Sequence, residues 1–436
     1  MIRTFAACLA GWFLVELVSA REPLDAPNVV VFIADDVSWS DVWPAVPTPN
    51  VQRLAEAGVT FRRAYAMPNC ITSRYATFFG RMGRREAVGS EYKSYLAPEG
   101  KAPSLAEVFR AAGYATAAFG KWHLPADPTD HENVISSGFQ HLRAGSAANL
   151  KGRGGKGYRH WQRIDDGQVG LSREYPTTAL RDEFLSWWAK EAGPKFAWVA
   201  FHAPHQPLHD PPSEVLPEGY EIRRGGKRLR EQYEAMVVSV DTVLGEMLAR
   251  IDLEETIVLF FGDNGTPPIA RLSNDERGRL KGTTFEGGVR VPVVLAGPGV
   301  AQGKESRALV HVMDWIPSLA DLAGVDVLEG AAADGVSFAE VARDPDVEGP
   351  RTEVFVERYE QDASKEKGGS PSHVDVSVIT RRYKLRRSSL SHRWQDHLYD
   401  LDSDPEERSP LDLSSDENKA IHARLAKLLD ELPPRR

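Results

Sequence analysis

Residues 28–36 read NVVVFIADD, an unbroken apolar run that ends in two aspartates. A run of this length without polar alternation is typical of a strand that is buried on both faces of a helix-covered parallel sheet. Further runs share this character at 114–119, 196–201, Thr256–Gly262 and 291–296. We therefore interpret all of these runs, including Asn28–Ala34, as buried parallel strands of one sheet.

Helical patterns lie between the apolar runs. Thr48 and Pro49 precede NVQRLAEAG, which combines a capping residue, a first-turn proline and a terminating glycine, and further helices are predicted at 104–112 and 231–251. The alternation predicts an α/β fold with a large mixed, mostly parallel sheet flanked by helices. After about residue 340 the pattern changes to short strands at 353–357, 375–381 and 397–400 and a closing amphipathic helix at 416–432. We divide the chain into a larger domain at 21–340 and a smaller α+β subdomain at 341–436.

The N-terminus predicts export. Arg3 precedes an apolar stretch at 4–18, and the small residues Val18-Ser19-Ala20 form a cleavage site, so residues 1–20 are interpreted as a secretory signal peptide. A buried N-terminal helix is the alternative. No other run approaches the roughly 18 apolar residues of a membrane span, so we expect none after cleavage. The expected location is periplasmic or extracellular.

Composition excludes several classes of protein. The chain has 436 residues, of which 42% are hydrophobic and 26% charged, and its formal net charge is −9. This composition excludes collagen-like and disordered chains. The negative balance argues against a dedicated nucleic-acid binder, which normally carries a basic domain, so we expect no nucleic-acid partner.

Polar clusters follow directly on four of the apolar runs. They are Asp35-Asp36, Lys121-Trp122-His123, the segment from His202 to His205, and Asp263-Asn264. The carboxyl ends of strands form the ligand-binding crevice in open α/β sheets, so these clusters are expected to converge on one site.

The oxygen-bearing clusters predict a metal site. Asp35, Asp36, Asp263 and Asn264 offer only oxygen ligands, which suit Ca²⁺, or Mg²⁺, better than zinc. The alternative is that Asp36 caps a helix and 263–265 form a turn.

Cys70 is the lone cysteine if residues 1–20, with Cys8, are removed, and so it has no disulfide partner in the chain. A small buried apolar residue is the ordinary interpretation of such a cysteine. A different interpretation of Cys70 is favoured by the sequence that begins with it, CITSR at 70–74, and by ordered motifs along the chain. These motifs are TPNVQRLAEAGVTFRRAYAMPN at 48–69, DDVSWSD at 35–41, GKWH at 120–123, APHQP at 203–207, FFGDNG at 260–265, KGTTFEGGVRVP at 281–292, YKLRR at 383–387 and LYDLDSDPEE at 398–407.

With these motifs the chain resembles the formylglycine-dependent sulfatases (arylsulfatase type) of the alkaline-phosphatase superfamily, which implies an alkaline-phosphatase-like fold. The resemblance implies that a maturation enzyme oxidises Cys70 to formylglycine, whose hydrate attacks sulfur and forms a covalent sulfate intermediate. Thr72 stands where the family most often has proline, and FFGRMGRR at 78–85 departs from the second half of its signature.

The resemblance also implies a role for each site residue. Cys70, as formylglycine, is the nucleophile and a metal ligand together with Asp35, Asp36, Asp263 and Asn264. Arg74 and Lys121 stabilise the ionised diol and Lys281 binds sulfate oxygens. His123 is the base for the second hydroxyl and His205 the acid for the leaving alcohol, whereas His202 and His209 are expected to line the pocket or hold structure.

The implied reaction is hydrolysis of a sulfate ester, with a sulfated carbohydrate as the expected substrate. Two basic segments without helix or strand periodicity, at 150–163 and 220–230, are expected to bind further anionic groups of such a polymer, although they could be solvated charges only. The alternatives are a phosphoester or phosphonate hydrolase of the same superfamily, and a noncatalytic sulfated-glycan binder if Cys70 stays unmodified.

Overall fold

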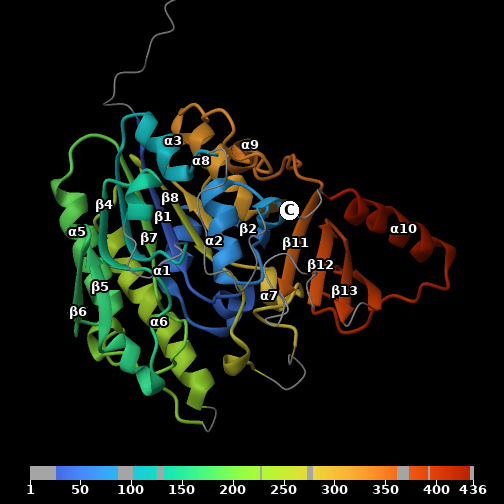
Figure 1. Ribbon diagram of the computed structural model, residues 1–436, viewed down its shortest axis with the longest axis horizontal. Helices are drawn as coiled ribbons and strands as arrows, with labels where there is room; N and C mark the ends of the chain where they lie inside the picture. Colours follow the sequence, from blue (N-terminus) through green and yellow to red (C-terminus); the bar gives the residue numbers. More distant parts are fainter. Residues whose placement is uncertain are drawn as a thin grey trace, which may run out of the picture.

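The computed structural model describes residues 26–86, 102–124, 132–225, 228–272, 278–360, 373–390 and 393–432. The signal peptide predicted at 1–20 lies outside these residues. A large body built on one sheet and a smaller antiparallel sheet near the C-terminus lie side by side (Figure 1). The predicted fold class, a large mixed sheet with helices and a smaller C-terminal α+β part, is confirmed.

The large sheet has ten strands and is mostly parallel around its centre, where β8, β1, β7, β3 and β4 run in the same direction. Its strand order is β10 (Lys304–His311), β2 (Gly58–Tyr65), β9 (Val293–Ala296), β8 (Thr256–Gly262), β1 (Asn28–Ala34), β7 (Lys195–Ala200), β3 (Ala115–Lys121), β4 (His141–Ser146), β5 (Trp161–Asp165) and β6 (Gln168–Ser172).

The unbroken apolar run of β1 is explained by helices on both faces of the sheet. Val29, Val31 and Ile33 belong to one core cluster and Val30 and Phe32 to the other, and all five are fully buried. One face is covered by α2 (Cys70–Phe79), α3 (Leu105–Ala111), α4 (Glu132–Ser136), α8 (Trp315–Ala323) and α9 (Ala339–Arg343), and the other by α1 (Pro49–Glu56), α5 (Pro176–Lys190) and α6 (Arg228–Leu248). Because a strand alternates its side chains, a two-sided core requires every residue to be apolar.

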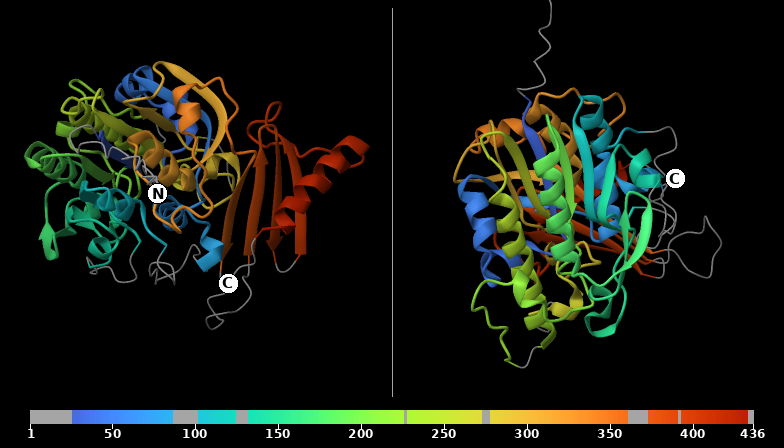
Figure 2. Two further views of the ribbon diagram at one scale, coloured as in Figure 1. Left: turned by 90° about the horizontal axis from the view of Figure 1, so that it is seen from above. Right: turned by 90° about the vertical axis from the view of Figure 1, so that its left-hand side faces the viewer.

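The small sheet consists of four antiparallel strands in chain order: β11 (Glu353–Glu360), β12 (His373–Thr380), β13 (Tyr383–Leu390) and β14 (Arg393–Asp400). Helix α10 (Asp416–Asp430) covers its outer side, away from the large body (Figure 2). On the inner side, residues of β11, β12 and β14 form one buried cluster with Tyr65, Val289 and Leu309 of the large body. The short helix α7 (Glu286–Val289) contributes Val289 to this junction.

Several expectations need correction. The strand expected at 291–296 begins at Val293 and runs antiparallel to its neighbours β2 and β8. Its residues are buried in either direction, so the apolar pattern cannot encode strand direction. The basic segments expected to be loops contain a 3₁₀ helix (Arg153–Tyr158), the start of β5 and, at Arg228, the start of α6. β13 was not predicted, because its charged residues interrupt any simple alternation.

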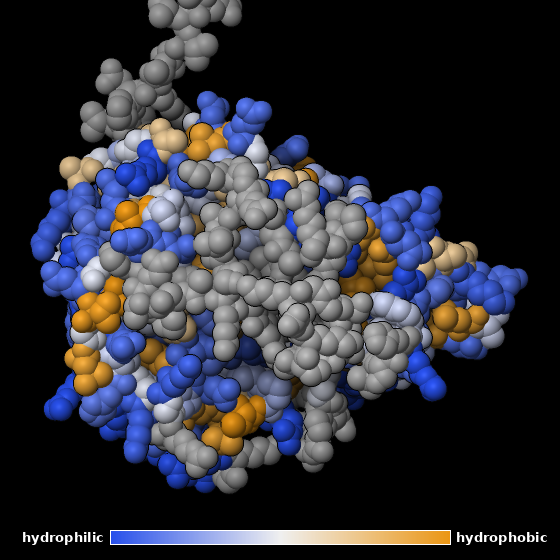
Figure 3. Space-filling model, viewed as in Figure 1, coloured by the Kyte–Doolittle hydropathy of each residue, from blue (hydrophilic) through white to orange (hydrophobic). Residues whose placement is uncertain are grey.

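None of the described helices combines the length and apolarity that crossing a bilayer requires. In the view of Figure 3 the coloured surface is mainly hydrophilic, with small and separate hydrophobic areas.

Candidate active site

The clusters that follow the strands lie at one edge of the large sheet. Asp35 and Asp36 follow β1, Asp263 and Asn264 follow β8, Lys121 ends β3, and the segment containing His205 follows β7. These strands are parallel neighbours, so their carboxyl ends open toward the same crevice. The structure therefore brings together side chains that are more than 200 residues apart in the chain.

Cys70 enters this edge as the first residue of α2. The Asn69 side chain caps the helix by accepting a hydrogen bond from the Thr72 amide, at 3.2 Å. The positive end of the helix dipole therefore points at the position where Cys70 sits and favours negative charge there. Cys70 itself is 3% exposed.

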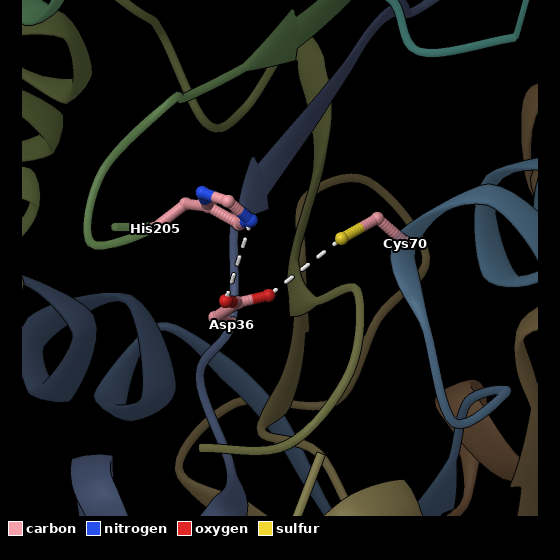
Figure 4. Close-up of side chains that lie close together, drawn as sticks. All are labelled: Asp36, Cys70 and His205. Carbon is pink, nitrogen blue, oxygen red and sulfur yellow. Dashed lines mark hydrogen bonds and ion pairs between the residues drawn. The ribbon is translucent and has the colours of Figure 1, made fainter. Parts of the chain in front are cut away.

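The thiol of Cys70 lies among charged groups. Its Sγ is 3.4 Å from Asp35 Oδ1, 3.6 Å from Asp36 Oδ1 and 3.0 Å from Lys281 Nζ. Figure 4 shows Asp36 between Cys70 and His205, with one carboxylate oxygen toward each of them. Two carboxylates and one ammonium group thus meet at a single sulfur atom.

Each of the three buried aspartates of this site has a cationic partner. Lys121 Nζ is 2.5 Å from Asp35 Oδ2, Lys281 pairs with Asp36, and Arg74 Nη2 is 3.0 Å from Asp263 Oδ2. Arg74 follows Cys70 by one helical turn, which places both on one face of α2. Its Nη1 also donates to the Lys121 carbonyl at 2.7 Å, so Arg74 joins β3 to β8.

The oxygen atoms of this cluster fit a hard cation. Ligand atoms of Asp35, Asp36, Cys70 and Asp263 all lie within 4.8 Å of one another. Asp36 Oδ2 and Asn264 Oδ1 are buried without a hydrogen-bond partner, although the Asn264 amide nitrogen donates to Asp36 Oδ1 at 2.8 Å. Buried oxygens with unused lone pairs inside a carboxylate cluster are the donor set that calcium and magnesium take.

The pKa values of the aspartates depend on their partners. Burial favours the neutral form of Asp35 and Asp36. Lys121 beside Asp35 and Lys281 beside Asp36, together with His205, jointly outweigh burial, so both pKa values lie below the ordinary range. Burial and the neighbouring Asp35 charge raise the pKa of Asp263 despite Arg74. Burial raises the pKa of the Cys70 thiol despite the nearby Lys121 and Lys281, so Cys70 is held as a neutral thiol and not as a thiolate.

Gly120 places Lys121 in the site. Its φ of +82° lies in the left-handed region, and a Cβ there would lie 2.1 Å from the Ala200 carbonyl oxygen, so glycine is required. The register of β3 with β4 shifts between Phe119 and Lys121 at this point. His123, two residues on, also has positive φ, +60°, and its Nδ1 is buried without a hydrogen-bond partner. Burial and the surrounding cations lower the pKa of His123 well below its ordinary value.

His205 approaches the cluster from the segment after β7. Its Nε2 lies 3.8 Å from Asp36 Oδ2, and its Nδ1 lies 2.6 Å from the Gln206 carbonyl. Because a carbonyl oxygen can only accept, Nδ1 carries a proton and Nε2 is the atom that faces the site. Burial lowers the pKa of His205, partly offset by Asp36.

The two other histidines of this segment make buried hydrogen bonds. His202 Nε2 lies 2.6 Å from Ser146 Oγ, and His209 Nε2 lies 3.1 Å from the Tyr175 hydroxyl oxygen. Sequence reasoning missed the partners that hold the site loops. Tyr158 contacts the carbonyls of His202 and His205, and Tyr233 donates to the Asp36 carbonyl at 2.7 Å. Neither tyrosine stands in a motif, and only the fold brings them here.

Comparisons with known proteins agree with this geometry. A protein-family model described as Sulfatase matches residues 27–325, and a second, described as N-sulphoglucosamine sulphohydrolase, C-terminal, matches residues 280–434. N-acetylgalactosamine-6-sulfatase from Mus musculus is 28% identical over 382 residues, which cover 76% of this chain and 70% of that protein.

Two solved structures share the fold. A crystal structure of Ps i-CgsB in complex with k-i-k-neocarrahexaose has a TM-score of 0.77 at 23% identity and covers 93% of this chain and 92% of its own. A phosphonate monoester hydrolase, SpPMH from Silicibacter pomeroyi, has a TM-score of 0.70 at 20% identity, with coverage of 93% and 94%. At these identities the two structures establish the fold alone.

Proposed function

We propose that this chain, which belongs to the sulfatase family and is a sulfuric ester hydrolase, hydrolyses the sulfate ester of a sulfated carbohydrate through a formylglycine derived from Cys70. The observation that carries the proposal is the position of Cys70 at the start of α2, within 3.6 Å of Asp35, Asp36 and Lys281. As an unmodified cysteine it would be a neutral, buried thiol and a poor nucleophile.

The oxidised residue, once hydrated, supplies one hydroxyl as nucleophile and a second whose deprotonation releases sulfate, which divides the hydrolysis into two steps. Asp35, Asp36, Asp263, Asn264 and the modified Cys70 would hold a Ca²⁺ or Mg²⁺ ion, which would supply positive charge against the sulfate ester.

The cationic side chains of the chain prepare the site for a dianionic centre. We assign Lys121 and Arg74 to stabilising the ionised nucleophile and Lys281, 3.0 Å from Cys70 Sγ, to binding the sulfate oxygens. Fixed charges of this kind act without reorganisation during the reaction, and a single donor can contribute roughly 100-fold or more in rate.

Two histidines have the proton-transfer roles in this proposal. His205 presents Nε2 to the space beside Asp36. As an imidazolium, the form that the Asp36 carboxylate favours, it would protonate the leaving alcohol from this atom. His123, with its unpartnered Nδ1, would take the proton of the second hydroxyl. Substitution of His205 by alanine should slow the release of a weakly acidic alcohol, which must be protonated as it leaves, more than the release of an acidic phenol.

The two basic segments, 150–163 and 220–230, give a reason to propose a polyanionic carbohydrate as the substrate. Both approach the segment that carries His205: Tyr158 ends the 3₁₀ helix of 150–163 and contacts the carbonyl of His205, and Arg224 pairs with Asp210 at 2.9 Å. Lys156, Arg223 and Arg228 are exposed nearby in sequence, whereas Lys227 lies outside the described residues. The Mus musculus relative, named for a sulfated sugar, is consistent with this class of substrate.

This substrate proposal predicts different losses on two substrates. Joint neutralisation of Arg223, Arg224, Lys227 and Arg228 should lower kcat/KM on a sulfated polysaccharide several-fold more than on 4-nitrophenyl sulfate. Raising the salt concentration should narrow the difference, because exposed charges are screened. Equal losses on both substrates would contradict a role in polymer binding.

The test of the central proposal is mass analysis of the Cys70 peptide, together with activity. Protein made with a formylglycine-generating enzyme should contain the lighter aldehyde form, and sulfatase activity should rise in proportion to its fraction. Cys70→Ala should fold and be inactive under the same conditions. Full activity in protein with only an unmodified thiol would overturn the proposal, and binding without turnover would favour the noncatalytic glycan binder.

The phosphonate monoester hydrolase of the same fold makes that activity the second candidate. Kinetics on matched sulfate and phosphonate monoesters, with metal analysis, would separate the two. We expect the sulfate ester to be preferred and one calcium or magnesium ion per chain. Preference for the phosphonate would favour the alternative, and two zinc ions per chain would count against the proposed function.

Two further proposals concern the whole chain. We propose that residues 1–20 direct export, which N-terminal sequencing of the mature protein from the periplasm or medium would test. We also propose 21–340 as the catalytic domain and 341–436 as a subdomain packed against it.

A further inference from the structure

Tyr158 is placed to hold the turn that carries His205. It is the last residue of the 3₁₀ helix Arg153–Tyr158 and is 1% exposed. Its hydroxyl oxygen lies 2.6 Å from the His202 carbonyl oxygen and 2.8 Å from the His205 carbonyl oxygen. A phenol has one proton to donate, so this proton is shared between the two acceptors.

The two carbonyls belong to the same tight turn. The His205 amide donates to the His202 carbonyl at 3.1 Å, which closes the turn, and the hydroxyl of Tyr158 bridges its two ends from outside. Without the hydroxyl, the buried His205 carbonyl would lose its donor from Tyr158, which destabilises this arrangement of the turn unless another donor replaces it. The turn would then relax toward other donors and carry the His205 ring with it.

The ring of Tyr158 is itself held in place. Its centroid lies 4.4 Å from that of His209 and 5.7 Å from that of Tyr175. Burial raises the pKa of Tyr158 well above its ordinary value, so the hydroxyl keeps its proton at neutral pH. Tyr158 is therefore a fixed donor anchored by side chains other than those of the reacting cluster.

We propose that Tyr158 is a positioning residue for proton donation by His205, acting through the two carbonyls of the turn. The inference rests on the proposed function, in which His205 protonates the leaving alcohol. His205 Nε2 has only a narrow range of useful positions, because proton transfer needs heavy atoms within hydrogen-bond distance of each other. Displacement of a catalytic group by about 1 Å costs up to roughly 100-fold in rate.

The test is Tyr158→Phe, which removes one oxygen atom and keeps the ring. Aryl sulfates with leaving phenols of different acidity measure the need for a proton donor directly. We expect kcat/KM for phenyl sulfate to fall about 10-fold or more, while kcat/KM for 4-nitrophenyl sulfate, whose phenolate leaves without protonation, stays within about 2-fold. The parameter kcat/KM is used because it covers the steps through departure of the phenol.

The ratio of the two kcat/KM values in one preparation does not depend on the fraction of folded or formylglycine-bearing protein. A partly folded variant therefore still answers the question. Tyr175→Phe is the matched control, since it removes a buried hydroxyl of the same aromatic cluster that bonds His209 instead of the turn carbonyls. Its ratio should equal that of the wild type.

His205→Ala distinguishes failure of this inference from failure of the proposed function. A selective loss on phenyl sulfate in His205→Ala together with an unchanged ratio in Tyr158→Phe would overturn only the role of Tyr158. Equal losses on both aryl sulfates in His205→Ala would overturn the acid assignment itself, and the inference with it.

Discussion

The guanidinium of Arg74 contacts the last residue of β3 and the residue that follows β8. Nε and Nη2 bind Asp263 Oδ2 at 3.1 and 3.0 Å, and Nη1 binds the Lys121 carbonyl at 2.7 Å. Lysine keeps the charge but cannot reproduce three directed bonds. We predict that Arg74→Lys lowers kcat/KM about 100-fold and the free energy of unfolding by about 2 kcal/mol, measured by aryl sulfate turnover and urea titration.

Arg62→Lys is the control for this prediction. Arg62 pairs with Glu305 at 2.9 Å, but both side chains are substantially exposed, at 40% and 58%. Exposed pairs contribute little, so neither turnover nor stability should change measurably. Wild-type turnover in Arg74→Lys would show that Arg74 has no role in catalysis.

Thr72 is the other residue at which a single change is informative. Its amide makes the capping bond to Asn69 Oδ1, and it lies in the first turn of α2, where proline is tolerated. We predict that Thr72→Pro, which restores the common family residue, raises the formylglycine fraction when the maturation enzyme is limiting, at a stability cost of about 1 kcal/mol. The mass of the Cys70 peptide measures the formylglycine fraction, and thermal unfolding measures the loss of stability.

Asn69→Ala removes the same capping bond without introducing proline. It should lower stability to a similar extent, and an equal loss in both variants would assign the cost to the cap. An unchanged or lower formylglycine fraction in Thr72→Pro would show that this position does not limit conversion.

At the scale of elements, a buried charged cluster joins α7 to the small sheet. Lys384 of β13 lies 3.1 Å from Glu286 Oε1 and 3.0 Å from Glu407 Oε1, and the Glu286 amide donates to Glu407 Oε2 at 2.5 Å. Burial, opposed by Lys384 and reinforced by Glu286, raises the pKa of Glu407 to about 7. One lysine between two carboxylates leaves an excess negative charge, and a proton on Glu407 relieves it.

This raised pKa predicts a pH dependence of stability. The folded chain binds the Glu407 proton more tightly than the unfolded chain, whose pKa is near the ordinary 4.5. The stabilisation is therefore fully present below about pH 4.5 and is lost as the pH rises through about 7, with a magnitude on the order of 3 kcal/mol at most. Urea titrations from pH 5 to 8 should show this decline as the difference in stability between the wild type and Glu407→Gln, because buried histidines of lowered pKa, such as His123 and His205, change stability in the opposite direction.

Glu407→Gln should lack the Glu407 contribution to the pH dependence of stability, since the amide mimics the protonated acid at every pH. Glu406→Gln is the matched control, because the neighbouring Glu406 is exposed and pairs with Arg408. It should keep the wild-type slope. A wild-type slope in Glu407→Gln as well would place the titrating group elsewhere.

At the scale of the whole molecule, the two sheets share a core. Tyr65 of β2 and Leu309 of β10 are buried with Val354 and Val356 of β11. We predict that the large body and the small sheet unfold in one calorimetric transition, because separating them would expose this cluster to water. Val356→Ala should lower the free energy of unfolding by about 2 kcal/mol, and the chain should still unfold in a single transition. Two separate transitions would show that the sheets are independent folding units.

Much of the fold could be predicted from local patterns. The bounds predicted for β1 and β8 match the structure, because each strand is buried on both faces and a two-sided core admits only apolar residues. β2 was missed because GVTFRRAY places two arginines inside a strand whose side chains reach the junction between the sheets. The direction of β9 was wrong for a related reason, since burial constrains composition and not polarity along the chain.

The amino-acid sequence by itself determined the fold class, the family and the position of each polar cluster at the end of a strand, because these depend on residue type and spacing along the chain. Only the tertiary structure decided that Arg74 binds Asp263, that Lys281 reaches the Cys70 sulfur and that Tyr158 contacts the turn of His205. Those contacts join residues from distant segments, and their distances follow from how helices and strands pack, which no local pattern encodes.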